Sequence, residues 1–282
     1  MKEARYYTKL KNKIVKCDLC PNECIIENNN IGICRVRKNI DGILYAVSYG
    51  EISGYSLDPI EKKPIKDYKP GSYIFSIGSY GCNLKCKFCQ NYEISQGNPN
   101  TLFFSPSEII DKAKKYKESI GIAYTYNEPI VNFEFVLDCL KLAKKENLDN
   151  VLVTNGFINE EPFKELLKYI DAVNIDLKAF NNNFYTEICA GRIEPVKKSI
   201  KIAAEMTHVE LTVLLIDNLN TDNKELNDMF KWIKEIDNTI PVHLSRYFPR
   251  YFMKNPPTEI STILEAFSIA GKHLKKVYLG NI

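Results

Sequence analysis

From residue 72 to its end, the chain alternates short apolar runs with amphipathic stretches of helical length. This rhythm is typical of parallel sheets whose strands are joined by crossover helices. Cap residues and an N-terminal proline at Ser105-Pro106-Ser107-Glu108 and at Glu160-Glu161-Pro162 predict the starts of two of these helices, and a last helix is expected over about 258–273. The expected strands are 73–79, 122–126, 151–154, 172–177, 209–216, 241–245 and a short final one at 277–279.

One face of the expected strands is polar. In the strand 172–177, Asn174 and Asp176 alternate with apolar residues, and Lys178 follows on the same face. Parallel strands are normally covered on both faces, so this polar face indicates a barrel lumen that holds a polar ligand. We expect an α/β fold with a partial (β/α)6 barrel over 71–282 and a ligand at the carboxyl ends of its strands. The same alternation occurs at Glu210, Thr212, His243 and Ser245.

Residues 1–70 break this rhythm and are expected to form a smaller, cysteine-rich extension and linker. Four of the nine cysteines of the chain fall in this extension, together with turn signals at 28–30 and 39–42. Several prolines between 59 and 70 predict a connecting segment laid over the main domain.

Charge and hydropathy exclude several classes of function. With 38 basic and 35 acidic residues, the net charge of +3 is too small to indicate a nucleic-acid or membrane partner. No apolar stretch approaches the roughly 20 residues of a membrane span, and the charged segment 1–13 lacks the form of a secretory signal. We therefore expect a cytoplasmic protein, in which cysteines bind metals more often than they form disulfides.

A second cysteine cluster directly follows the first expected strand, at the end where a barrel places its active site. Three thiolates, Cys82, Cys86 and Cys89, can hold an iron–sulfur cluster while one of its irons keeps no protein ligand. An open coordination position is typical of a catalytic site. The alternative is a closed zinc knuckle that takes a fourth ligand from elsewhere, such as His243.

The Cys82–Cys89 loop resembles the CxxxCxxC loop of the radical S-adenosylmethionine (SAM) enzymes, with Phe88 at its aromatic position. Asn127-Glu128-Pro129, Thr154-Asn155-Gly156 and Asp176-Leu177-Lys178 follow in an order similar to the branch that contains glycyl-radical-enzyme activases. The narrower resemblance is to the radical SAM enzyme of the AmmeMemoRadiSam system. It rests on Cys17-Asp-Leu-Cys20-Pro21, Gly32-Ile-Cys34, Asp58-Pro-Ile-Glu61-Lys-Lys-Pro64, Cys89-Gln-Asn91, Ser245-Arg-Tyr-Phe248 and Leu279-Gly-Asn281.

The resemblance implies a [4Fe–4S] cluster on Cys82, Cys86 and Cys89. It also implies reductive cleavage of SAM to a 5'-deoxyadenosyl radical that abstracts hydrogen from a substrate. A reductant such as flavodoxin or ferredoxin would supply the electron. The substrate is open: a glycyl radical enzyme, a Memo-like or AMMECR1-like protein, or a small molecule. Contacts to the cofactor are expected from Phe88, Asn127, Glu128, Asn155, Asp176 and Lys178.

Some of these residues also have a purely structural interpretation. Asp176 and Lys178 could be a compensating pair in the lumen, and Asn155 could belong only to a turn. His243 is either a catalytic residue that contacts substrate or ribose, or a buried histidine with satisfied hydrogen bonds. Cys189 is either a reactive thiol near the barrel mouth or a packed small residue.

Cys17, Cys20, Cys24 and Cys34 have a spacing that matches neither the ferredoxin run nor an ordinary zinc finger. A unit of roughly 40 to 50 residues is near the size at which a fold needs a metal. We expect a second metal here, either zinc or an auxiliary [4Fe–4S] cluster, with bare thiols as the remaining alternative. An iron–sulfur electron carrier or a zinc-ribbon binding protein without SAM chemistry is the alternative function, and it leaves the polar strand face unexplained.

Overall fold

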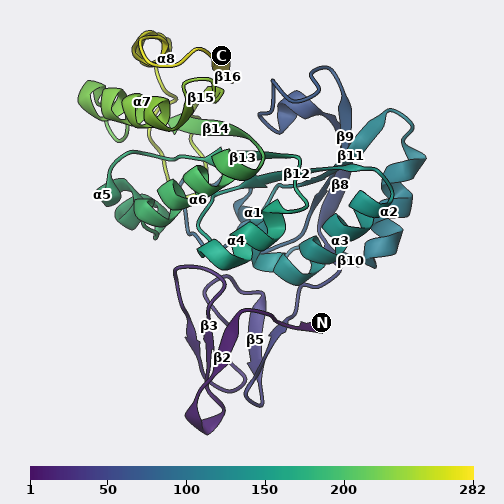
Figure 1. The fold of residues 1–282 in the computed structure, drawn as a ribbon. Helices are drawn as coiled ribbons and strands as arrows, with labels where there is room; N and C mark the ends of the chain where they lie inside the picture. Colours follow the sequence, from purple (N-terminus) through teal and green to yellow (C-terminus); the bar gives the residue numbers. More distant parts are fainter.

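The computed structural model describes all residues from Met1 to Ile282, and its centre is an eight-stranded sheet in the order β16-β15-β14-β13-β12-β11-β9-β8 (Figure 1). All neighbours pair in parallel except β8 and β9, which are antiparallel. Strands β8 and β16 stand at the two ends and do not pair, so the barrel is open and the expected partial barrel is confirmed. The bounds are β8 Gly54–Pro59, β9 Tyr73–Gly78, β11 Ser119–Tyr124, β12 Asp149–Thr154, β13 Ala172–Asp176, β14 His208–Leu215, β15 Val242–Arg246 and β16 Val277–Gly280.

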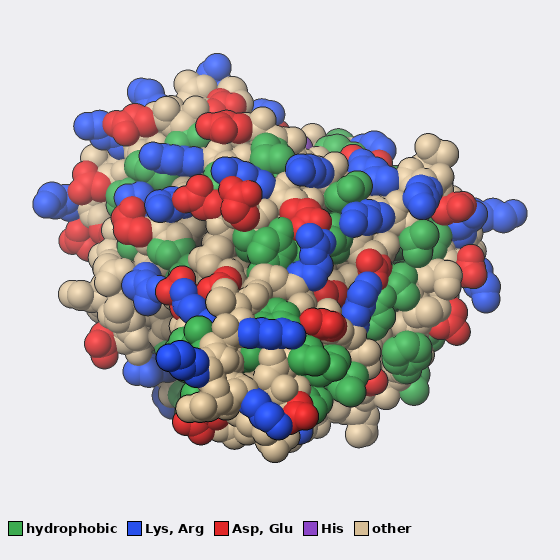
Figure 2. Space-filling view, turned by 60° about the horizontal axis from the view of Figure 1, so that its bottom comes forward, with side chains coloured by type: hydrophobic (Ala, Val, Ile, Leu, Met, Phe, Trp, Pro, Cys, Tyr) green, Lys and Arg blue, Asp and Glu red, His purple; other side chains and the backbone are tan.

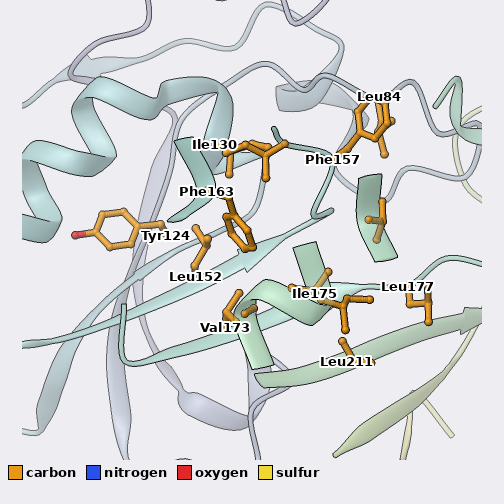
Figure 3. Close-up of a cluster of buried hydrophobic side chains, with 14 of the residues drawn as sticks. Leu84, Tyr124, Ile130, Leu152, Phe157, Phe163, Val173, Ile175, Leu177 and Leu211 are labelled. Carbon is orange, nitrogen blue, oxygen red and sulfur yellow. The ribbon is translucent and has the colours of Figure 1, made fainter. Parts of the chain in front are cut away.

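Helices follow the strands in turn and cover the outer face of the sheet (Figure 1). The first long one begins with a capping box, in which the Ser105 and Glu108 side chains each accept from the other's backbone N–H. Apolar side chains of these helices pack onto the outward side chains of the strands, such as Leu152, Val173 and Leu211 (Figure 3). The helices are α1 Tyr92–Ser95, α2 Pro106–Lys115, α3 Phe133–Lys145, α4 Glu160–Leu167, α5 Asn182–Phe184, α6 Ile193–Met206, α7 Asn223–Asp237 and α8 Ile260–Gly271, with 3-10 turns at Lys11–Lys13, Ile60–Lys62 and Pro129–Asn132 and a π-helix at Tyr185–Cys189.

The inner face of the sheet is filled at its amino-terminal end by the segment that follows β8. Ile60 and Ile65 are fully buried there, in a small cluster with apolar side chains of β9, β11, β12 and β13. Glu210 accepts hydrogen bonds from the backbone N–H groups of Lys66 and Asp67 at 2.8 to 3.0 Å. We expected residues 59–70 to lie over the main domain, but part of this segment lies inside the lumen and closes its floor.

The first 50 residues form a lobe below α3 and α4 (Figure 1). The lobe consists of two three-stranded sheets, with orders β1-β6-β5 and β2-β3-β4. A buried ion pair joins the lobe to the barrel. The Arg37 guanidinium donates to both carboxylate oxygens of Glu134 on α3 at 2.8 and 2.9 Å. The bounds are β1 Lys2–Glu3, β2 Tyr7–Lys9, β3 Val15–Cys17, β4 Ile25–Ile26, β5 Arg37–Ile40 and β6 Ile43–Ala46; β7 Glu51–Ile52 pairs with β10 Leu102–Phe103.

Side chains of both charges are interspersed over the face shown in Figure 2, without a large region of one sign. This agrees with the small net charge of the chain. The longest helix, α7, has 15 residues, and none of the helices has the length and apolarity needed to cross a bilayer.

Candidate active site

The loop from Cys82 to Cys89 lies between the carboxyl end of β9 and α1. Leu84 anchors it by burying its side chain beside Phe157 (Figure 3). The backbone N–H groups of Lys85 and Lys87 donate to the carbonyls of Cys189 and Ile188 at 2.8 and 2.9 Å. The loop is therefore held by a π-helix, an element that is frequently found at functional sites.

All three thiols of this loop line one cavity of about 290 Å³. This volume is close to the lower end of the range for small-molecule sites in proteins. Residues at the carboxyl ends of the strands form another part of the wall, next to the thiols. All of the expected cofactor contacts line this cavity: Phe88, Asn127, Glu128, Asn155, Asp176 and Lys178. The other lining residues are Gln90, Asn91, Ser95, Tyr126, Thr212, Leu214, Ser245 and Asn281.

The three thiols differ in their electrostatic surroundings. Burial raises the pKa of Cys82 well above its usual value, and the nearby Glu128 charge adds to this. Burial also raises the pKa of Cys89. The pKa of Cys86 is lowered, first by a hydrogen bond with the Cys189 thiol and further by the Lys178 charge. Cys189 is thus a fully buried neighbour of Cys86, a contact that its sequence position alone did not reveal.

Glu128 lies deepest in the cavity wall, where it caps the turn Pro129–Asn132. Its carboxylate accepts from the Thr154 hydroxyl and from the Asn155 N–H, both at 2.7 Å, and from the Ile130 N–H at 3.2 Å. Its pKa is nevertheless raised to about 7, chiefly by burial and to a smaller extent by the Asp176 charge. Glu128 can therefore change its charge near neutral pH while it joins the ends of β11 and β12.

Two amide side chains connect the cavity wall to the cysteine loop. Asn155 donates to the Asn83 side-chain oxygen at 3.0 Å and points its Nδ2 at the Cys82 sulfur at 3.7 Å. Asn127 accepts from the Ser79 N–H and donates to the Gly81 carbonyl, both at 3.0 Å. Asn155 therefore does more than form a turn, and Asn127 fixes the backbone that leads into the loop.

Asp176 and Lys178 lie at the end of β13 with Nζ and Oδ2 2.9 Å apart. Burial alone would lower the pKa of Lys178. The negative charges of Asp176, Cys86 and Cys189 have the larger effect, so the pKa of the lysine lies well above its usual value. Its ammonium also lies 5.7 Å from the centre of the Phe88 ring. The cavity therefore holds one firmly charged cation beside the cysteine loop.

The structure does not bring His243 to this cavity. Its Nε2 lies 2.6 Å from Oε2 of Glu210, and Glu210 also contacts His208 at 2.9 Å. His243 points into the lumen as its strand position predicted, but it sits two residues too far toward the floor, and Ser245 lines the cavity instead. Of our two interpretations, this geometry favours the buried histidine with satisfied hydrogen bonds.

The four remaining clustered cysteines lie in the N-terminal lobe, at the end of β3 and in the turns before β4 and β5. Cys17, Cys20 and Cys34 are buried and Cys24 is half-buried. The lobe contacts the cysteine loop directly, since Asn22 donates to the Asn83 carbonyl at 2.7 Å. Nowhere in the chain do three or more His, Cys, Asp or Glu side chains form a group that could hold a single metal ion.

The model of the Radical SAM superfamily matches residues 76–233, more than half of the chain. The chain belongs to the radical SAM superfamily. Its chemistry is thus SAM-dependent radical chemistry, and the family implies a [4Fe–4S] cluster and SAM. This membership supports SAM chemistry over our alternative of an electron carrier or zinc-ribbon protein without it.

Several relatives align with more than half of this radical SAM protein. It is 39% identical to an uncharacterised protein of Methanocaldococcus jannaschii, over 100% of this chain and 86% of that one. It is 28% identical to a putative glycyl-radical enzyme activating enzyme of the same organism, over 71% and 77% of the two chains. A pyruvate formate-lyase-activating enzyme of Clostridium pasteurianum is 24% identical, over 59% and 72%. The similarity to the activase branch is confirmed.

Solved structures confirm the radical SAM fold. A radical SAM methyltransferase from Sphaerobacter thermophilus superposes with a TM-score of 0.59 and 15% identity, over 75% of this chain and 67% of that one. A domain of pyruvate-formate lyase-activating enzyme from Bacteroides vulgatus superposes with a TM-score of 0.51 and 20% identity, over 57% and 99%.

The residues at the cavity fit the two groups that the family implies. Three thiols from one loop face it, and no fourth cysteine lines it, so a cluster there would keep one iron free of protein ligands. The wall supplies a lysine for a carboxylate and acidic and amide oxygens for an ammonium, which are the donors that the amino-acid end of SAM requires.

Proposed function

We propose that Cys82, Cys86 and Cys89 bind the [4Fe–4S] cluster of this radical SAM enzyme and that the carboxyl ends of β11, β12 and β13 bind SAM. The observation that carries the proposal is that all three thiols line the same cavity as Asp176 and Lys178. When bound and reduced by an external electron donor, a cluster held by these three thiols would supply the one electron needed to split SAM into methionine and a 5'-deoxyadenosyl radical, and that radical would take a hydrogen atom from the substrate.

In this proposal the side chains of the chain bind and orient SAM. Lys178 holds the carboxylate of its methionine part, because it is the cation beside the cysteine loop and Asp176 keeps it charged. Asp176 and the carbonyl oxygens of the strand ends accept from the ammonium. Glu128 does not contact SAM in this proposal. Its carboxylate accepts from the backbone N–H of Asn155 and so positions that residue.

For the substrate, we propose hydrogen abstraction from a glycine of a partner protein, as an activase would perform, with a reductant such as flavodoxin or ferredoxin. Two relatives that carry activating-enzyme names support this. Gln90, Asn91 and Asn281 line the cavity and are exposed to solvent, so a segment of another protein can approach the site from this side.

The SAM proposal is tested by anaerobic reconstitution with iron and sulfide, followed by a SAM cleavage assay with dithionite. We expect 5'-deoxyadenosine and methionine from the native chain. Cys82→Ala, Cys86→Ala and Cys89→Ala should each abolish cleavage, because each thiolate is one of three anchors. Cys139→Ala is the matched control, since Cys139 is a fully buried core residue on α3. Full cleavage by one of the three loop variants would refute the ligand assignment.

The activase proposal is tested separately, by adding a candidate glycyl radical enzyme to the reduced protein and SAM. We expect a glycyl radical signal in electron paramagnetic resonance, and no signal when the radical-bearing glycine is replaced by alanine. SAM cleavage without a glycyl radical on any candidate from the same genome would refute the activase role and leave the SAM proposal standing.

A further inference from the structure

The four cysteines of the N-terminal lobe converge although they come from three separate segments. The Cys17 N–H donates to the Cys24 carbonyl at 2.9 Å, which brings the two ends of the 17–24 loop together. The Cys24 sulfur lies 3.6 Å from the position of a Cβ on Gly32, two residues before Cys34. Gly32 and Arg35 close the turn that carries Cys34.

Their thiols also affect one another. Burial raises the pKa of Cys20 to about 12, and the nearby Cys17 and Cys34 contribute to this. Burial raises the pKa of Cys34 to about 11, again with contributions from Cys17 and Cys24. Four thiols at such close quarters are an unusual use of a small core, because each is a weak hydrogen-bonding group that gains little from burial beside the others.

Arg37 provides a second and independent observation. It is 1% exposed, and its two terminal nitrogens are satisfied by Glu134 and by the Arg5 carbonyl at 3.1 Å. Its Nε is one of only two buried side-chain polar atoms in the chain without a hydrogen-bond partner. An unpaired buried donor is costly, so a missing acceptor is expected beside it.

Burial lowers the pKa of Arg37, but the charges of Glu134, Cys17 and Cys34 raise it above its usual value, so both cysteines lie close to the guanidinium. A sulfur of either cysteine is therefore a candidate for the missing acceptor. A metal turns these thiols into thiolates, and thiolate sulfur accepts an N–H hydrogen bond.

We propose that Cys17, Cys20, Cys24 and Cys34 bind a second [4Fe–4S] cluster, with the Nε–H of Arg37 directed at its thiolate sulfurs. The four sulfurs do not form a group that could hold a single ion, and the same is true of Cys82, Cys86 and Cys89. Zinc would need all four sulfurs at about 2.3 Å from one point, whereas a cluster carries each thiolate on a different iron. The four thiols share this property with Cys82, Cys86 and Cys89, for which the family implies a cluster, and on this ground we choose the cluster over zinc.

This second centre lies against the first cysteine loop. The Asn83 side chain forms a hydrogen bond with the Cys20 thiol, and Asn83 follows Cys82 directly. The Cys34 carbonyl lies 2.6 Å from where a Cβ on Gly81 would be. Asn83 therefore contacts both centres: it follows Cys82 in the chain and its side chain reaches the Cys20 thiol.

The test uses the full chain with Cys82, Cys86 and Cys89 all replaced by alanine, purified and reconstituted anaerobically, with measurement of iron, sulfide and zinc. We expect about four irons and four sulfides per chain and a paramagnetic signal after reduction with dithionite. Further replacement of Cys20 and Cys34 by alanine should remove both, whereas Cys139→Ala should not. About one zinc per chain, or no metal at all, would overturn the proposal.

A second measurement uses Arg37→Lys in the triple-alanine background, where the iron content after reconstitution shows whether the lobe is still folded around its centre. Lysine keeps a cation beside Glu134 but lacks the Nε–H group. We expect the cluster to persist with a shifted reduction potential, since hydrogen bonds to sulfur tune that potential. An unchanged potential would show that Arg37 does not face the cluster. Neither measurement requires SAM cleavage, so the result is independent of the proposed function.

Discussion

The backbone N–H of Asn155 donates to Oε2 of Glu128 over 2.7 Å and thereby joins the carboxyl ends of β11 and β12. Glu128 is 3% exposed and Asn155 is 5% exposed, so water does not compete for this bond. From this pair, Asn155 extends to Cys82 and Asn83. The buried carboxylate thus sets the position of the cysteine loop without contacting it.

The charge of Glu128 should make stability depend on pH near neutrality. Its pKa is raised to about 7 in the folded chain, against 4.5 when unfolded, chiefly by burial. The folded state then binds more protons between these values, so stability falls as pH rises from 4.5 to 7 and is constant above. The full loss is about 3 kcal/mol. The charged or titratable groups that face Glu128 are Asp176 and Cys82.

Glu128→Gln should remove this dependence. The difference in melting temperature between the native chain and the variant, measured from pH 5 to pH 8, should shift in favour of the variant as pH rises. A difference that stays constant over this range would show that Glu128 has an ordinary pKa.

Lys178→Met should weaken SAM binding roughly 10-fold to 100-fold, because a charge-assisted hydrogen bond contributes about 1.5 to 3 kcal/mol. The absorption spectrum of the cluster should not change, since Lys178 is not a proposed ligand. Lys198→Met is the control, as Lys198 is an exposed lysine on α6. Titration of the reconstituted protein with SAM measures the affinity, and equal affinity in both variants would make Lys178 a purely structural residue.

Gly81→Ala should separate the N-terminal lobe from the cysteine loop. A methyl group here would lie 2.6 Å from the Cys34 carbonyl, and φ is +86°. Gly71→Ala is a matched control, because Gly71 has φ +78° but nothing within 4 Å. Both variants incur about 1–2 kcal/mol of backbone strain, and Gly81→Ala adds about 1–3 kcal/mol for the contact. Thermal unfolding compares them, and equal melting temperatures would contradict the close approach.

Glu134→Gln should lower the free energy of unfolding by about 3–5 kcal/mol, because it leaves the buried Arg37 guanidinium without its counter-charge. The control is Glu146→Gln, whose pair with Lys114 is exposed and contributes about 0–1 kcal/mol. Denaturant unfolding of the two variants measures the difference. Similar free energies would show that the lobe does not depend on this ion pair.

Most of the barrel could be predicted from sequence because its strands are apolar runs bounded by helix caps. All seven expected strands occur, although β11 begins at Ser119 rather than 122. Strand β8 was missed, because the run 54–59 has little apolar character and ends in a proline. It pairs through its backbone at the edge of the sheet, where proline is tolerated.

The sequence predicts which residues lie on the inner face of the sheet, but it predicts less well how far along the strand the cavity begins. Alternation correctly puts Ser245 and His243 on the inner face, but it does not tell which of them reaches the cavity. Asn281 lines the cavity and bonds to Ser245 at 2.9 Å, and its place just after the last strand was an available signal. The contact between Cys86 and Cys189 depends on a π-helix, which no sequence pattern indicated.

Ile60 and Ile65 close the floor of the lumen and so limit the routes by which molecules can enter and leave the barrel. Molecules cannot pass through the lumen from that end, so the proposed SAM would reach the cysteine loop from the carboxyl ends of the strands or through the gap between β8 and β16. In the proposed function a macromolecular substrate would approach from the carboxyl ends as well. The gap between β8 and β16 then decides whether SAM and its products can exchange while the partner is bound.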